Sequence, residues 1–149
     1  MALAPMFLAK LIGGANGILT GWLILIGLLN FFGLNAIVDW GREGKSAYRA
    51  ASFYLFFLAL LGPVANGRID AVATFAAMLG LVQVYRDRLR LGMVFFTLGA
   101  WLKIWPVAAA LALYTSAKHR ISVLLAAVST SVAILAAGFF LGGNENLFS

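Results

Sequence analysis

RDRLRLGMVFFTLGAWLKIWPVAAALALYTSAKHR, residues 86–120, is an apolar run with a basic cluster at each end and Lys103 near its middle. Basic residues that flank membrane segments favour the cytoplasmic side. If both clusters follow that rule, the run cannot cross a bilayer once. It must enter and return, with its turn at Lys103-Ile104-Trp105-Pro106. A cation at membrane depth is costly and is a hint of function. The stretch therefore predicts a broken re-entrant helical hairpin.

The composition of the whole chain is that of a membrane protein. Of its 149 residues, 63% are hydrophobic and 11% are charged, and the mean hydropathy is +0.98. Residues 17–38 and 121–142 contain no charge, and each run is long enough to span a bilayer. We expect an all-α polytopic membrane protein, a single domain over residues 1–149, with about four spanning helices besides the hairpin.

The remaining helices are expected to be short. A second helix over residues 47–61 is stopped by Gly62-Pro63, and the others are expected at 70–85, 91–101 and 106–115. The helix over 70–85 would be ~24 Å long and the last two ~17 Å or less, against a hydrocarbon core of ~30 Å. Their ends must lie in protein or beside water, which indicates a piece of a larger bundle. Gly13, Gly17 and Gly21 predict a ridge of small residues for helix packing.

Charge bias orients the chain. We place three basic segments on the cytoplasmic side of the membrane: residues 41–49, 86–90 and 118–120. Together they contain eight of the eleven Lys and Arg residues. The same bias explains the net charge of +6, so no nucleic-acid partner is expected. Arg68, Asp70, the Lys103 turn and residues 144–146 then meet at the outer face. Chemistry is expected there.

Two cations are the main site candidates. Arg68 and Lys103 can each donate to the oxygens of an anionic group such as a lipid phosphate. Alternatively, Arg68 pairs with Asp70, and Lys103 extends to the interface. Asp70 is interpreted as the cap of the next helix in preference to a general base. Trp101 and Trp105 fit either sugar stacking or an interfacial aromatic belt.

Several kinds of chemistry lack the residues they need. The sequence contains no metal-ligand cluster, nucleophile–base pair or phosphate-binding Gly loop, so neither a metal nor a cofactor is expected. His119 lies in a basic loop and is interpreted as solvated. The five acidic residues all fall at helix ends or in loops, which argues against a proton-coupled antiporter.

Two motifs carry a family resemblance. LGPVANGRID at residues 61–70 and GAWLKIWP at residues 99–106 resemble glycosyltransferase family 87, actinobacterial GT-C-type membrane enzymes that are similar to polyprenyl-phosphate-mannose-dependent mannosyltransferases. In that family a Gly-Arg-x-Asp turn precedes a helix, and an apolar-Lys-x-Trp-Pro element follows about thirty residues later. GGNEN at residues 142–146 resembles the family's Gly-x-Asn-Glu segment. The likeness covers residues 51–149.

The resemblance implies inverting transfer of a hexose, mannose, from a polyprenyl-phosphate donor on the extracytoplasmic side. Arg68 and Lys103 would bind the donor phosphate, with Asp70, Trp105, Asn144 and Glu145 in support. The family's catalytic acid comes from a loop after its first transmembrane helix, but residues 1–38 contain no acid. The catalytic residue is therefore unknown, and the chain resembles an internal segment that is inactive alone.

The implied partners are membrane lipid, the polyprenyl-phosphate-sugar donor and the remainder of such an enzyme. The alternative is a non-enzymatic integral membrane protein that packs against partner helices or binds anionic lipid through Arg68 and Lys103. A transporter is the third hypothesis.

Overall fold

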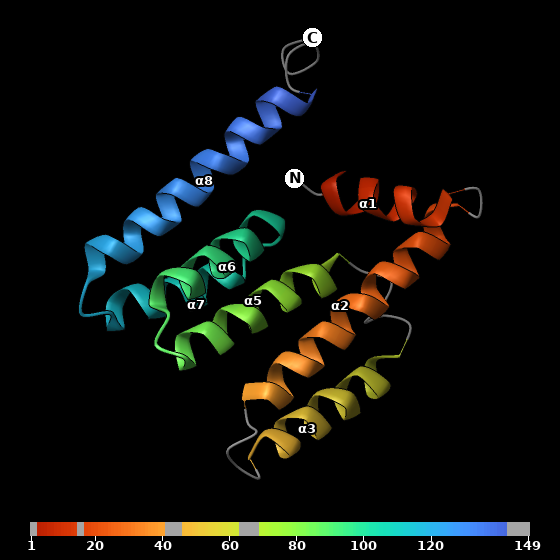
Figure 1. Ribbon diagram of the computed structural model, residues 1–149, viewed down its shortest axis with the longest axis horizontal. Coiled ribbons are helices and arrows are strands. Elements are labelled where there is room, and N and C mark those ends of the chain that lie inside the picture. Colours follow the sequence, from red (N-terminus) through yellow and green to blue (C-terminus); the bar gives the residue numbers. More distant parts are fainter. Residues whose placement is uncertain (1–2, 15–16, 41–45, 63–68, 143–149) are drawn as a thin grey trace.

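The computed structural model describes residues 3–14, 17–40, 46–62 and 69–142, and their regular structure is entirely helical (Figure 1). The predicted all-α class is confirmed for this part of the chain. The helices are α1 (Leu3–Gly13), α2 (Ile18–Trp40), α3 (Ser46–Leu61), α5 (Asp70–Tyr85), α6 (Leu89–Leu102), α7 (Pro106–Ser116) and α8 (Arg120–Gly142).

Local chemistry accounts for several helix ends. Gly62 follows α3 with φ +53°, a left-handed conformation that glycine adopts without a steric penalty. Asp87 follows α5 with φ +56° and turns the chain towards α6. Pro106 is the first residue of α7, where a proline loses no helical hydrogen bond. These signals are local, so the predicted bounds of α2, α3, α5, α6, α7 and α8 agree with the structure to within about two residues.

Helices α6 and α7 form the predicted hairpin. Gly99 near the end of α6 faces Pro106 at the start of α7. At the far end, Met93 and Leu113 share a buried cluster. The chain therefore turns back at Lys103, and the basic clusters at residues 86–90 and 118–120 return to the same end of the bundle, where Arg90 and His119 line one groove.

Helix α6 is the centre of the larger hydrophobic core. Phe96 is 2% exposed and packs in one cluster with residues of α5, α7 and α8. Helices α5 and α6 touch backbone to backbone, because a Cβ on Gly92 would lie 2.7 Å from Val84 Cγ2 and 3.1 Å from the Gly80 carbonyl oxygen. Glycine at both helices thus sets the separation of α5 and α6.

A second close contact joins α1 to α2. A Cβ on Gly21 would meet the Ala9 carbonyl oxygen and would lie 2.6 Å from the Gly13 nitrogen. Gly17 takes no part in this contact, since it lies outside both helices with φ +89°. The predicted ridge of three glycines on one helix is therefore wrong. Helix α1 ends at Gly13 and α2 begins at Ile18, so Gly13 and Gly21 face each other from two different helices.

Helix α3 lies against α2, and one polar bond between them is the Tyr54 hydroxyl donating to Asn30 Oδ1 at 2.6 Å. Much of the rest of α3 is exposed, including Phe53 and Phe56 at 68% and 66%. Such apolar exposure marks a surface that meets lipid or other protein.

Among the described residues, two helices are long and apolar enough to cross a membrane by length and composition. They are the stretches Ile18–Asp39 in α2 and Arg120–Phe140 in α8. The other helices in the described part of the chain are shorter. On α8 only 6% of the apolar window is fully buried, and most of its described side chains are exposed.

Candidate functional site

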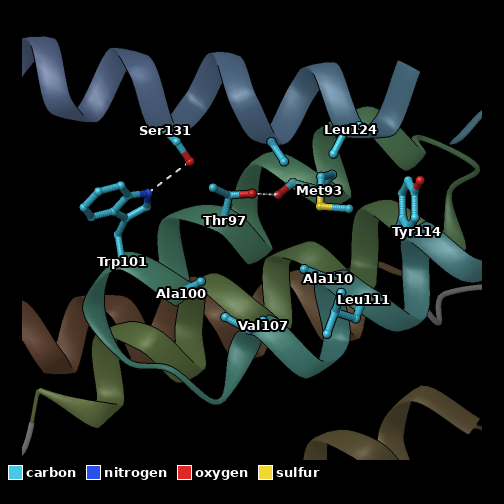
Figure 2. A pocket seen from close by; sticks show the side chains of 11 residues that line it. Met93, Thr97, Ala100, Trp101, Val107, Ala110, Leu111, Tyr114, Leu124 and Ser131 are labelled. Carbon is cyan, nitrogen blue, oxygen red and sulfur yellow. Dashed lines mark hydrogen bonds between the residues drawn. The ribbon is translucent and has the colours of Figure 1, made fainter. Parts of the chain in front are cut away.

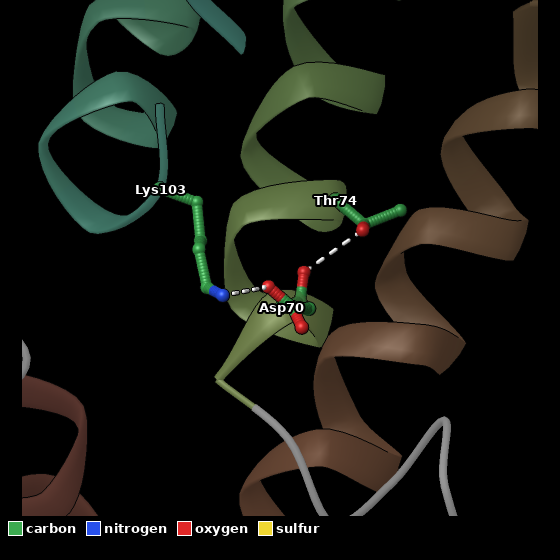
Figure 3. Close-up of polar contacts among 3 residues, drawn as sticks. All are labelled: Asp70, Thr74 and Lys103. Carbon is green, nitrogen blue, oxygen red and sulfur yellow. Dashed lines mark hydrogen bonds and ion pairs between the residues drawn. The ribbon is translucent and has the colours of Figure 1, made fainter. Parts of the chain in front are cut away.

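The predicted outer residues meet in an ion pair. Lys103 Nζ lies 3.0 Å from Asp70 Oδ1, and the two side chains are 39% and 35% exposed (Figure 3). The pair joins the start of α5 to the turn between α6 and α7. A half-exposed pair contributes only about 0–1 kcal/mol to stability. Its importance is that it holds a cation in a defined position.

The backbone of the turn is fixed by its own hydrogen bonds. Helix α6 ends at Leu102, and Lys103 is extended while its N–H donates to the Gly99 carbonyl at 2.9 Å. The Val107 N–H donates to the Ile104 carbonyl at 3.1 Å and so begins the first turn of α7. Lys103 is thus an extended residue between the end of α6 and the first turn of α7.

Next to the turn, α6 and α7 pack closely against each other and against α5. A Cβ on Gly99 would lie 3.2 Å from Pro106 Cβ and 3.3 Å from the Ala73 carbonyl oxygen. Pro106 is fully buried. Because three helices converge on a position without a side chain, Lys103 lies within reach of the first residue of α5.

Asp70 is the first residue of α5, and Ile69 occupies the capping position without a side-chain cap bond. The predicted cap role of Asp70 is therefore corrected. Its carboxylate still lies at the positive end of the helix, where a negative charge is favourable. Thr74 Oγ1 donates to the Asp70 carbonyl at 2.8 Å (Figure 3). Ile69 packs against a buried cluster that includes Trp22 of α2.

The other predicted site residues are distributed unevenly. Arg68, Asn144 and Glu145 lie outside the described residues. Trp105 lies on the turn beside Lys103 and is 46% exposed, and the adjacent Ile104 is 83% exposed. The structure thus brings Asp70, Lys103 and Trp105 to one end of the bundle.

A groove of about 540 Å³ lies between α6, α7 and α8 (Figure 2). Its walls are mainly apolar, and Met93 and Leu111 are among them. Trp101 lies at its edge nearest the Lys103 turn, and the Trp101 indole N–H donates to Ser131 Oγ at 3.2 Å. This bond ties α6 to α8. Because the indole N–H is already used in this hydrogen bond, Trp101 has fewer polar contacts to offer a sugar.

Charges in the described part of the chain are divided between the two ends. The basic end, defined by the start of α3 and the loops α5–α6 and α7–α8, carries Arg49, Arg86, Arg88, Arg90, Lys118 and Arg120. The opposite end, where α5 begins and the chain turns from α6 to α7 (Figure 1), carries the Lys103–Asp70 pair. This is the asymmetry that the charge bias predicts for the described cations.

Sequence reasoning missed the pairing itself. Lys103 was predicted to bind an anionic group or to extend to the interface, and Asp70 was predicted to cap its helix or to pair with Arg68. The available signal was the placement of opposite charges in one predicted outer cluster. Family models, curated proteins and solved structures were all compared with the chain, and none of them matches it.

Proposed function

We propose that the chain is a multi-pass membrane protein, with α2, α3, α5 and α8 spanning and the α6–α7 hairpin re-entrant. The apolar stretches of α2 and α8 support this, as do the exposed side chains of α3. The basic end would lie on the cytoplasmic side and the Lys103 turn on the extracytoplasmic side. Short helices such as α7 are tolerated at membrane depth where protein surrounds their ends.

Within that membrane protein, we propose a role in hexosyl transfer, with mannose as the sugar and a polyprenyl phosphate as its carrier, as in glycosyltransferase family 87. The observation that carries this proposal is the half-exposed Lys103 ammonium held 3.0 Å from Asp70 at the hairpin turn. The chain would act as a segment or subunit of a larger enzyme.

The chemistry assigns different tasks to the two charges. When the bond between the sugar carbon and the phosphate oxygen breaks, negative charge grows on the leaving phosphate, and a fixed cation there stabilises the transition state. A lysine ammonium has three donor hydrogens. One can bond to Asp70 while the others remain directed at the phosphate. Asp70 would thus be a positioning residue, and no acceptor-activating base is assigned.

The membrane orientation is tested by labelling, which the absence of cysteine makes simple. In intact cells, Ile104→Cys is expected to react with an impermeant thiol reagent, because Ile104 is exposed at the turn. His119→Cys, at the exposed basic end, is expected to react only after the membrane is opened. Reaction of His119→Cys alone in intact cells would invert the orientation.

The donor site is tested with a photoreactive polyprenyl phosphate on the purified chain in lipid nanodiscs. Lys103→Gln is expected to reduce labelling by about tenfold, because a hydrogen bond to a charged group contributes roughly 1.5–3 kcal/mol. Lys103→Arg keeps the charge and is expected to retain most labelling. Arg86→Gln, at the exposed basic end and outside the lining of the grooves, is the control and should label normally.

A competition experiment shows whether the labelling depends on the phosphate. Unlabelled polyprenyl phosphate should displace the probe, and the uncharged polyprenol should not. Equal labelling of Lys103→Gln and the unmodified chain would reject the phosphate role of Lys103.

The alternative is a non-enzymatic membrane protein that packs against partner helices. The exposure of α8, with Phe139 and Phe140 at 59% and 84%, favours it. In that protein the Lys103–Asp70 pair would be purely structural. Normal folding together with no phosphate-dependent labelling would select this alternative.

A further inference from the structure

A second groove, of about 920 Å³, lies at the basic end of the bundle. It is formed by the start of α6, the α7–α8 loop and the first turns of α8. The groove is lined by Arg90, Lys118, His119, Arg120, Ile121 and Leu125, among others. Its volume falls in the range of small-molecule sites, about 300–1,000 Å³. It lies at the opposite end of the hairpin from Lys103.

The groove is strongly cationic. Arg90, Lys118 and Arg120 contribute three positive charges, and among the described residues none of those that line the groove is acidic. Arg120 is held in place, since its Nη2 donates to the Thr115 carbonyl oxygen at 3.1 Å. An adjoining hollow of about 470 Å³ shares Arg90 and His119 and adds Arg88 together with Asp87. Two separate sequence clusters thus form one positive surface.

The wall along α8 is apolar. Ile121 and Leu125 line the groove one turn apart and are 76% and 62% exposed. The same exposed stripe continues along α8 through Val128 and Val132. A ligand that fits this groove has an anionic head and a long apolar tail. A nucleic acid or a soluble phosphate would leave the apolar wall uncovered.

We propose that this groove binds an anionic glycerophospholipid of the surrounding leaflet. The phosphate lies among Arg90, Lys118 and Arg120, and an acyl chain lies along Ile121 and Leu125. Basic pockets between membrane helices bind anionic head groups in this manner. The inference rests on the proposed membrane location, but not on sugar transfer. A bound lipid would join the start of α6 to the α7–α8 loop and so close the open end of the hairpin.

The test measures lipid binding to the full chain after delipidation, by native mass spectrometry with phosphatidylglycerol or phosphatidylcholine added. The unmodified chain is expected to prefer phosphatidylglycerol. Arg90→Gln and Lys118→Gln are each expected to weaken its binding about fivefold. Arg120 is left unchanged because it also bonds to Thr115.

Arg86→Gln is the matched control. Arg86 is exposed at the same end but lines neither groove, so its loss removes one charge and should leave lipid binding unchanged. An equal loss of binding in Arg86→Gln, or equal binding of the two lipids, would overturn the groove as a specific site. Displacement of phosphatidylglycerol by an acidic peptide at equal concentration would also overturn it.

Lys103→Gln separates this inference from the proposed function. It should reduce polyprenyl phosphate labelling about tenfold, as above, and leave phosphatidylglycerol binding intact. If Lys103→Gln removed phosphatidylglycerol binding instead, the lipid site would lie at the turn, and the groove proposal would fail.

Discussion

Gly99→Leu is expected to separate Lys103 from Asp70 and to destabilise the helical bundle by about 3 kcal/mol, the upper part of the range for overpacking. The first added carbon would already lie 3.2 Å from Pro106 Cβ and Cγ and 3.3 Å from the Ala73 carbonyl oxygen. Two of these atoms belong to a rigid ring and the third to the backbone. None can rotate away, so α7 must move off α5.

The separation can be measured in a chain that contains no natural cysteine. Asp70→Cys combined with Lys103→Cys is expected to be bridged efficiently by a short bifunctional thiol reagent, because the native side chains meet at 3.0 Å. Adding Gly99→Leu should reduce the bridged fraction severalfold and lower the midpoint of thermal unfolding.

Gly27→Leu is the control, since a Cβ on Gly27 meets nothing within 4 Å. It should bridge and unfold like the parent. Unchanged bridging in the Gly99→Leu background would mean that the contact of Gly99 with Pro106 does not position Lys103.

Gly21→Leu is expected to detach α1 from α2. A Cβ on Gly21 would meet the Ala9 carbonyl oxygen and would lie 2.8 Å from the Ala9 carbonyl carbon. Ala9 itself is completely buried at this crossing. Backbone cannot yield as a flexible side chain does, so the helices must part at a cost of about 3 kcal/mol.

Limited proteolysis of the chain in nanodiscs measures this detachment. Gly21→Leu should expose α1 to cleavage near Lys10, the basic residue in its last turn, whereas Gly27→Leu on the same helix should resemble the parent. Equal protection of both variants would show that α1 does not depend on the glycine crossing.

The helices themselves could be predicted because their signals are local. Pro106 begins α7 and Gly62 follows α3, and each acts through its own backbone. The turn at Lys103 was also predictable, because charge at the two flanks of one apolar run restricts how that run can lie in a membrane. The prediction that Gly17 lies on one helix with Gly13 and Gly21 was wrong. Regular spacing in the sequence does not reveal whether the helix continues through it.

The site was predictable only in part. That Lys103 and Asp70 share one end follows from topology. That they pair at 3.0 Å depends on the contact of Gly99 with Pro106 and Ala73, three residues from three helices. Arg68, Asn144 and Glu145 lie outside the described residues.

For the described residues, the sequence by itself determined the helical class, the limits of the helices after α1 and the end of the bundle at which the basic clusters and Lys103 lie. These depend on hydropathy, on proline and glycine, and on net charge, which are properties of short segments. Only the tertiary structure decided which charges meet. Lys103 bonds to Asp70, and Arg90 shares a groove with Lys118, because backbone contacts at glycine set the spacing and register of the helices, and register is a property of two helices together.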